Sequence, residues 1–212
     1  MMKQVLSGIA MSLAAGFASG QTTNFDLGPV GQPPAGWQCG VTGSGSPKWS
    51  VERDATAPSP PHVLRQSGSG DFPWCVKAGT SLANGFVEVR FKSISGREDQ
   101  AGGLVWRWKD GGNYHVARAN ALENNVSLYC TQKGSRRTLK YVDAPVPANV
   151  WHLLRVEFAS ERIKVLLDGK LAIEAHDAHI TGSGAVGVWT KADSVTAFDD
   201  FNCVPTALGA GQ

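Results

Sequence analysis

Acidic side chains offer the most direct chemistry in this sequence, because glycoside bonds are cleaved by two carboxylates held about 5 to 10 Å apart. The candidates are Glu98 and Asp99 in GREDQ and Glu123 in NALENN. One carboxylate of such a pair acts as the acid and the other as nucleophile or base. The sequence has no run of acidic residues alternating along one strand. Catalysis by these groups therefore requires the fold to bring them together.

A second set of polar groups lies in YHVARAN, where strand alternation separates two faces. The small residues Ala117 and Ala119 suit packing against another sheet, which sends the opposite face outward. That face carries Tyr114, Val116, Arg118 and Asn120.

The outward face has the chemistry of a sugar site. Arginine offers a planar fork of donors, asparagine both a donor and an acceptor, and aromatic rings a flat apolar surface. Trp106 and Trp189 are candidates for stacking, and Glu123 and Lys191 lie near the strand ends as polar closing groups. The alternative is that the polar residues simply face solvent and the tryptophans belong to the core.

The first twenty residues have the pattern of a secretory signal peptide. Lys3 gives a positive start, residues 5–17 are apolar, and Ala18-Ser19-Gly20 is a small-residue end. We expect a mature chain of residues 21–212 that forms one domain and is released to the periplasm or the medium, without a membrane span. Loss of Lys3 lowers the formal charge from +2 to +1, so neither nucleic acid nor an anionic membrane is an expected partner.

Four cysteines in an exported chain allow disulfides in three possible pairings. Cys39 in GWQCG and Cys75 in FPWCV share an aromatic, turn-rich setting, and we take them as the first choice. Cys130 and Cys203 lie in strand-like sequence and are interpreted as buried thiols. No C-x-x-C or close Cys/His spacing predicts zinc. The nearby His176, Asp177 and His179 of EAHDAH are interpreted as polar loop residues.

Short alternating segments with frequent turn signals run through the chain, and no helical period is present. GFVEVRFKSI alternates apolar and charged residues, GGLVWRWK places Leu104, Trp106 and Trp108 on one predicted face, and Asp168-Gly169 has the pattern of a tight hairpin turn. The pattern predicts an all-β fold of two packed antiparallel sheets, a sandwich of the jelly-roll type.

Several segments in this order resemble the concanavalin A-like (laminin G-like) jelly roll, and most of all the branch of the 3-keto-disaccharide hydrolase domain. They are residues 86–129, VWHLLRVEF, VLLDGK and VGVWTKADSVTAFDDF, so the resemblance covers about residues 24–205. It implies a secreted bacterial protein that binds or cleaves glycosides on one sheet. It also implies a structural calcium ion at Asp200 in FDDF; no other cofactor is expected.

Three hypotheses for function follow. The first is a secreted carbohydrate-binding module. The second is a hydrolase or lyase acting on 3-keto-glycosides, with Glu98, Asp99 and Glu123 as candidate catalytic residues. The third is an adhesion or structural domain of the laminin G kind, whose sheet face binds protein.

Overall fold

A computed structural model describes residues 22–206, which contain fourteen β-strands. The expected signal peptide lies outside these residues. The fourteen strands are β1 (Trp37–Ser46), β2 (Trp49–Arg53), β3 (His62–Gln66), β4 (Ser69–Lys77), β5 (Gly85–Ser95), β6 (Ala101–Asp110), β7 (Asn113–Asn120), β8 (Asn125–Gln132), β9 (Ser135–Asp143), β10 (His152–Ala159), β11 (Arg162–Leu167), β12 (Lys170–His176), β13 (Ala185–Trp189) and β14 (Val195–Pro205).

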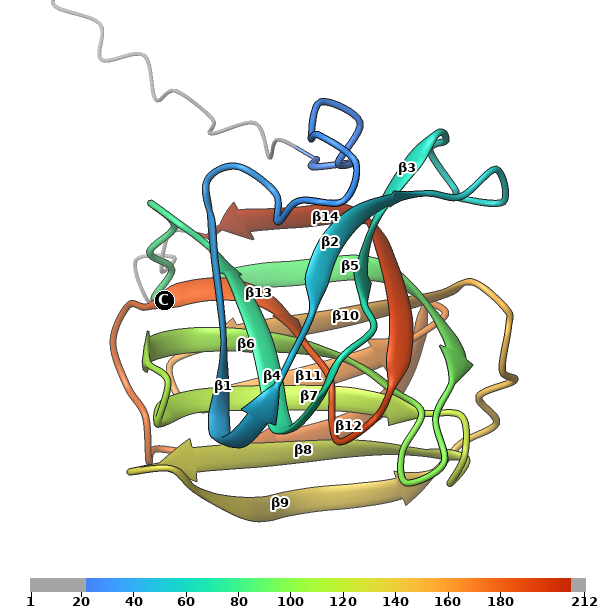
Figure 1. Ribbon diagram of the computed structural model, residues 1–212. Coiled ribbons are helices and arrows are strands. Elements are labelled where there is room, and N and C mark those ends of the chain that lie inside the picture. The colour runs from blue at the N-terminus through green and yellow to red at the C-terminus, as the bar shows by residue number, and fades with distance from the viewer. Residues whose placement is uncertain (1–21, 207–212) are drawn as a thin grey trace, which may run out of the picture.

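The strands form two seven-stranded sheets (Figure 1). The first sheet has the order β1-β4-β13-β6-β7-β8-β9, and the second has the order β12-β11-β10-β5-β14-β3-β2. All pairings between named strands are antiparallel. The predicted all-β sandwich is confirmed, and no helix occurs in residues 22–206.

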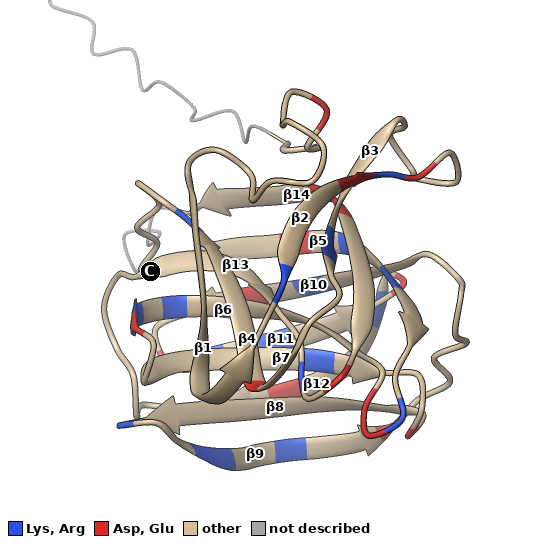
Figure 2. Ribbon diagram, in the orientation of Figure 1, with Lys and Arg blue, Asp and Glu red and all other residues tan. Residues whose placement is uncertain are grey.

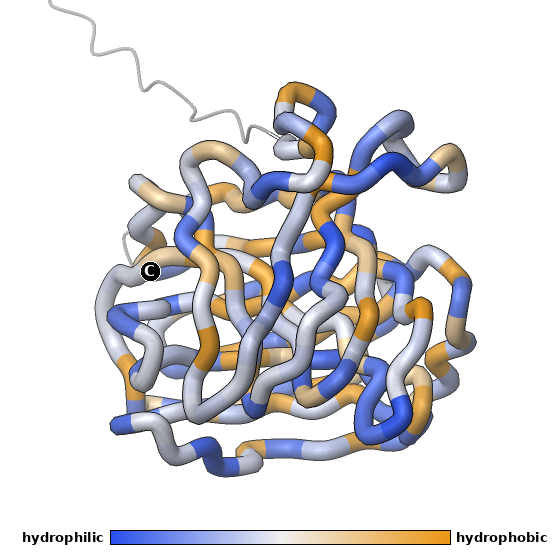
Figure 3. Tube along the Cα trace, in the orientation of Figure 1, coloured by the Kyte–Doolittle hydropathy of each residue, from blue (hydrophilic) through white to orange (hydrophobic). Residues whose placement is uncertain are grey.

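The main core lies between the sheets and follows from strand alternation. In β5, Val87, Val89 and Phe91 are fully buried, whereas the residues between them are half-exposed. From the first sheet, Leu104 of β6 and Leu128 of β8 belong to the same cluster. Apolar residues recur at short intervals along the trace in Figure 3. Burial of these side chains is the main stabilising contribution, at about 1.5 to 3 kcal/mol for each large one.

The predicted hairpin turn at Asp168-Gly169 is present, and a second short loop precedes it. The loop between β10 and β11 is formed by Ser160 and Glu161, and Asp168-Gly169 joins β11 to β12. Both residues of the second turn have a positive φ, 51° at Asp168 and 76° at Gly169. A two-residue hairpin loop needs this geometry, and Asp-Gly adopts it readily.

Strand β6 departs from the predicted alternation at Arg107. This residue has a φ of 49°, and the pairing of β6 with β7 shifts register between Trp106 and Asp110. As a result Trp106 packs in the core between the sheets, while Trp108 packs on the opposite face. The prediction that Leu104, Trp106 and Trp108 share one face is therefore wrong for Trp108.

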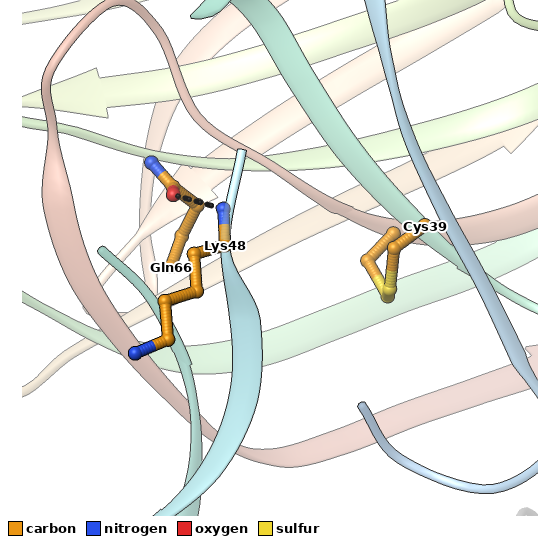
Figure 4. The surroundings of a disulfide bond; sticks show 4 residues. Cys39, Lys48 and Gln66 are labelled. Carbon is orange, nitrogen blue, oxygen red and sulfur yellow. Dashed lines mark hydrogen bonds between the residues drawn. A yellow bond between two sulfur atoms is a disulfide. The ribbon is translucent and has the colours of Figure 1, made fainter. Parts of the chain in front are cut away.

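The disulfide between Cys39 and Cys75 is formed, as the sequence predicts (Figure 4). The two residues lie directly opposite each other in β1 and β4. Close by, the side-chain oxygen of buried Gln66 accepts a hydrogen bond from the Lys48 amide at 3.3 Å. Cys130 is a buried free thiol and Cys203 is a partly buried one.

Within residues 22–206 there is no helix with the length and hydrophobicity needed to cross a lipid bilayer.

Removing the disulfide tests its contribution to stability. Cys39 and Cys75 are 36 residues apart in the chain, and closing a loop of that size stabilises a fold by roughly 3 to 4 kcal/mol. We expect Cys39→Ser/Cys75→Ser to lower the free energy of unfolding by about that amount in urea denaturation. Cys203→Ser is the control and should change it by about 1 kcal/mol or less. Equal stability of the double variant and the control would contradict this role.

Candidate functional site

A buried cluster of charges occupies one end of β7 in the first sheet. Arg118 donates from Nη1 to both oxygens of the Asp99 carboxylate, each at 2.9 Å. Asn120 Nδ2 donates to the same carboxylate at 2.8 Å, and Lys191 Nζ lies 2.5 Å from it. Asp99 is completely buried and Arg118 almost so. Each charge is thus paired, as burial in a protein interior requires.

Glu123 joins the cluster from the turn between β7 and β8. Its Oε2 accepts hydrogen bonds from Arg118 Nη2 at 2.7 Å and from Asn125 Nδ2 at 2.8 Å. Partial burial acts to raise the pKa of Glu123, but these hydrogen bonds and the charge of Arg118 outweigh it and lower the pKa. Glu123 is therefore ionised at neutral pH and stabilises the Arg118 cation.

The loop that carries Asp99 is fixed by Asp193. The Asp193 carboxylate accepts hydrogen bonds from the backbone amides of Arg97, Glu98 and Asp99, at 2.7, 3.0 and 3.2 Å. These amide donors outweigh a small effect of burial and lower the pKa of Asp193. Asp193 follows β13 and Asp99 precedes β6, so the contact joins two neighbouring strands of the sheet at the charge cluster.

Aromatic residues cover the outer face of the first sheet, the face turned away from the second sheet. Trp189 and Phe72 are stacked with ring centroids 6.0 Å apart. The Arg136 guanidinium lies over both Tyr129 and Phe72, at 4.2 and 4.5 Å from the ring centroids. Such contacts combine dispersion with cation–π attraction. The result is an aromatic surface next to the charge cluster.

Arg136 has a hydrogen-bonding group without a partner. Its Nη1 is buried, yet no protein atom among the described residues accepts a hydrogen bond from it. Burial lowers the pKa of Arg136, although an arginine remains charged under ordinary conditions. A buried donor normally has an acceptor, so this Nη1 is an exception within the aromatic surface. The sequence analysis did not identify Arg136. Strand alternation in SRRTLKYV could have done so, because it places Arg136 and Arg137 on opposite faces of the sheet.

A hollow of about 460 Å³ borders these groups. Phe72, Asp71 and Ser44 line one side, and Glu98 and Lys191 line another. It combines an aromatic ring with charged and hydroxyl groups, which is typical of a site for a small polar ligand. Figure 2 shows acidic and basic residues interspersed over both sheets, including basic positions on β9.

The structure brings together most of the predicted site residues. The charge cluster contains Asp99, Arg118, Asn120, Glu123 and Lys191. Trp189 lies in the outer aromatic cluster, fully buried beneath Phe72 and Arg136, so the prediction that a ligand stacks on its ring is wrong. Arg118 and Asn120 are buried instead of open to solvent, so neither is a plain solvent-facing residue.

Two further predicted ligand contacts do not fit. Trp106 is fully buried in the core between the sheets, stacked on His115 with ring centroids 5.2 Å apart. A ligand on the outer face does not reach it, because strand alternation turns the side chain inward. Tyr114 is on the outer face, but its hydroxyl is buried 2.7 Å from Thr42 Oγ1 of β1. Tyr114 therefore packs beneath the outer surface and is not open to a ligand.

The predicted catalytic carboxylates differ in what they can do. Asp99 is surrounded by three donors and fully buried, so it holds cations in place and has no free oxygen face for proton transfer. Glu98 is exposed and lines the hollow. Glu123 is partly exposed but is shared between Arg118 and Asn125. The carboxylates of Asp99 and Glu123 therefore position the cations of the cluster, and of the three carboxylates only Glu98 lines the hollow.

Asp200 lies far from this cluster, at the β14 bulge, with a φ of 48°. Its Oδ1 accepts a hydrogen bond from Ser59 Oγ at 2.7 Å, and neighbouring Asp199 Oδ2 accepts one from the Ser59 amide at 2.8 Å. Burial, with the nearby charges of Asp200 and Asp26, raises the pKa of Asp199 to about 6. The oxygens of Asp199 face backbone amides; a calcium ion at Asp200 stays a prediction.

No family model matches the chain. Part of it, 104 residues or 48% of its length, is 29% identical to levanase from Bacillus subtilis (strain 168). That stretch spans 15% of the length of levanase, so the likeness concerns a small part of the larger protein.

Solved structures share the fold. The carbohydrate-binding module CBM66 from Bacillus subtilis matches with a TM-score of 0.63 and 22% identity, over 78% of this chain and 93% of the module. The β-glucanase of Bacillus licheniformis matches with a TM-score of 0.56 and 14% identity, over 92% of this chain and 100% of the enzyme. The chain is thus a jelly roll of the kind found in both carbohydrate-binding modules and glycoside hydrolases.

Neutralising Asp99 tests the charge cluster. Asp99→Asn leaves Arg118 and Lys191 facing a neutral amide in a buried site. Breaking a buried ion pair by removing one partner costs roughly 3 to 5 kcal/mol, and we expect a loss of this size in the free energy of unfolding. Glu98→Gln, one residue earlier and exposed, should change it by about 0.5 kcal/mol or less. Comparable losses in both variants would show that Asp99 does not anchor the cluster.

The raised pKa of Asp199 predicts a pH-dependent stability. Between about pH 4 and pH 6 the folded state binds more protons at this group than the unfolded state, so stability falls as the pH rises through that range. With the pKa raised from 3.8 to about 6, the loss is roughly 2 to 3 kcal/mol. We expect the stability of the wild type, relative to Asp199→Asn, to decrease by that amount from pH 4 to pH 7. Parallel curves in urea denaturation would refute the shift.

Proposed function

We propose that this protein binds carbohydrate on the outer face of its first sheet, in the hollow bordered by Phe72, Glu98 and Lys191. The observation that carries the proposal is the Arg136 guanidinium, which is stacked on Phe72 and Tyr129 and has a buried donor without a partner. A sugar hydroxyl supplies the missing acceptor. The half-buried ring of Phe72 offers an apolar surface to the C–H groups of the sugar.

The charge cluster gives the site its rigidity. Arg118 and Lys191 are both held by Asp99, so the partly exposed Lys191 ammonium is fixed in direction before a ligand arrives. Such preorganisation reduces the entropy lost on binding. The wall formed by Glu98, Asp71 and Ser44 adds acceptors and a hydroxyl, which suits a ligand with many hydroxyl groups more than an apolar one.

The similar proteins support this function. One solved structure with the same fold is a carbohydrate-binding module, and the relative with partial sequence identity is a levanase. We therefore propose a glycan as the ligand class and levan as a first probe. We also propose that the chain is exported, since residues 1–20 have the pattern of a signal peptide, and that it meets its ligand outside the cytoplasm.

Two alternatives remain. A glycoside-cleaving enzyme of the 3-keto-disaccharide hydrolase kind is supported by the resemblance of the sequence, but the engaged state of Asp99 favours binding over catalysis. For an adhesion domain, the fold is the only support. The binding experiment separates the three, because product release marks the enzyme, and silence toward all glycans leaves adhesion to a protein.

The proposal is tested by a glycan screen. We expect tryptophan fluorescence or calorimetric titration to detect binding to one member of a panel of levan, other oligosaccharides and 3-keto-glucosides, without release of product. Phe72→Ala and Arg136→Ala should each weaken that binding by at least roughly tenfold, since each removes a stacking or donor group worth about 1.4 kcal/mol or more.

The control is an equivalent pair on the second sheet. There Arg155 lies over the Phe86 ring at 3.6 Å from its centroid, so Arg155→Ala removes the same type of contact away from the site. Its affinity for the glycan should equal that of the wild type. Equal weakening by Arg155→Ala and Arg136→Ala would place the ligand elsewhere or reveal a general loss of structure. Turnover of any panel member would favour the enzyme.

A further inference from the structure

Three residues with metal-binding side chains meet at the inner side of the first sheet, away from the outer-face site, and a fourth, His179, contacts one of them. They come from three parts of the chain. His115 is in β7, Cys130 is its direct cross-strand partner in β8, and Asp177 and His179 are in the loop that follows β12. One ligand atom each of His115, Cys130 and Asp177 lie within 4.8 Å of one another, and all three residues are buried.

Asp177 lies at the centre of the group. Its Oδ1 is 2.7 Å from His115 Nε2, and its Oδ2 is 2.5 Å from His179 Nδ1. Zinc–ligand bonds of about 2.0 to 2.3 Å place the donors of a tetrahedral site roughly 3.3 to 3.8 Å apart. Small movements of these side chains therefore make room for an ion. His179 is 41% exposed at its side chain, which opens a route for the ion from solvent.

The His115 ring has an unusual environment. It is fully buried, and its Nδ1 has no hydrogen-bond partner among residues 22–206. Burial is the main reason why the pKa of His115 is lowered, against the attraction of Asp177. Neutral imidazole is the form of histidine that binds metals.

The charges around the group decide which ion fits. Asp177 is negative, whereas the buried Arg107 lowers the pKa of His115 and the Arg137 guanidinium lies against the His179 ring. Burial, with the charge of Asp177, raises the pKa of the Cys130 thiol to about 11, so this sulfur ionises only when a cation replaces the proton. With a thiolate and a carboxylate as ligands, a divalent ion gives a neutral centre.

We propose that His115, Cys130, Asp177 and His179 form a binding site for a zinc-type transition metal ion. Thiolate, imidazole and carboxylate together are a zinc donor set, while calcium and magnesium prefer oxygen ligands alone. Binding releases the proton of Cys130. The ion joins β7 and β8 of the first sheet to the loop after β12, and it stabilises the folded state because the unfolded chain holds these residues apart.

The Arg137 guanidinium competes with the metal ion for the His179 ring. It is the cross-strand neighbour of Cys130 in β9, and its side chain is exposed. Its long side chain can therefore move into solvent when the metal enters. Removing the positive charge should strengthen metal binding, which distinguishes a metal site from a hydrogen-bonded network that needs Arg137.

The experiment is a titration of the purified full chain with Co²⁺, monitored by absorption, followed by competition with Zn²⁺. We expect one equivalent of Co²⁺ to produce a thiolate-to-cobalt charge-transfer band that Zn²⁺ abolishes. The band should be absent in Cys130→Ser and present in Cys203→Ser, which changes the other free thiol. Reductants that cleave the disulfide are left out.

Further variants locate the remaining ligands. His179→Ala should weaken binding by roughly tenfold or more, whereas His176→Ala, three residues earlier and outside the group, should not. Arg137→Gln should strengthen it by roughly threefold or more. Zinc should also raise the unfolding temperature of the wild type, and a chelator should reverse the rise.

Three results would overturn the proposal: no charge-transfer band at one equivalent of Co²⁺ in the wild type, a band that persists in Cys130→Ser, or equal effects of His176→Ala and His179→Ala. If Cys130→Ser does not fold, the exposed His179 provides the test, because its replacement leaves the core intact.

Discussion

The buried carboxylate of Asp99 is the constraint on which the outer face of the first sheet depends. Isolated charges are expensive to bury, and Arg118 and Lys191 are tolerated at this depth because one carboxylate accepts from both. Asp99 is held in turn by its loop, whose three amides bind Asp193. The geometry of the charged site therefore follows from the backbone of a five-residue connection between β5 and β6.

This pairing determines which groups are left for a ligand. The charges of Arg118 and Lys191 are already balanced by Asp99, and that of Arg118 also by Glu123. Arg136 has no carboxylate partner among the ion pairs of the described residues; its guanidinium rests on aromatic rings instead. A ligand that needs a donor above an aromatic surface therefore fits at Arg136, whereas the charge cluster acts as its support.

The fold could be read from the sequence because alternation and turn residues are local signals. Val87, Val89 and Phe91 show the buried face of β5 without any knowledge of its partners, and Asp168-Gly169 defines its own turn. The site was predictable in part: Arg118 and Asn120 interrupt an apolar pattern. The position of Trp108 was not predictable, because the bulge at Arg107 is stabilised by contacts of its guanidinium with the distant carbonyls of Ile180, Ala83 and Ser160.

The group of residues around Asp177 was even harder to predict from the sequence, because it also depends on contacts between distant segments. In the sequence, EAHDAH has the pattern of a polar loop and Cys130 that of a buried thiol. The close Cys/His spacings that are typical of zinc sites do not include either of them. They meet for two reasons. First, β7 pairs with β8, which places His115 opposite Cys130. Second, the loop after β12 runs beside the end of β8, where Gln132 Nε2 donates to the His179 carbonyl at 3.1 Å. Two adjacent residues of β9 contact different groups because side chains alternate along a strand. Arg136 packs on the outer aromatic face, whereas Arg137 contacts His179. A single pairing register thus builds two chemically different groups of side chains on opposite faces of one sheet.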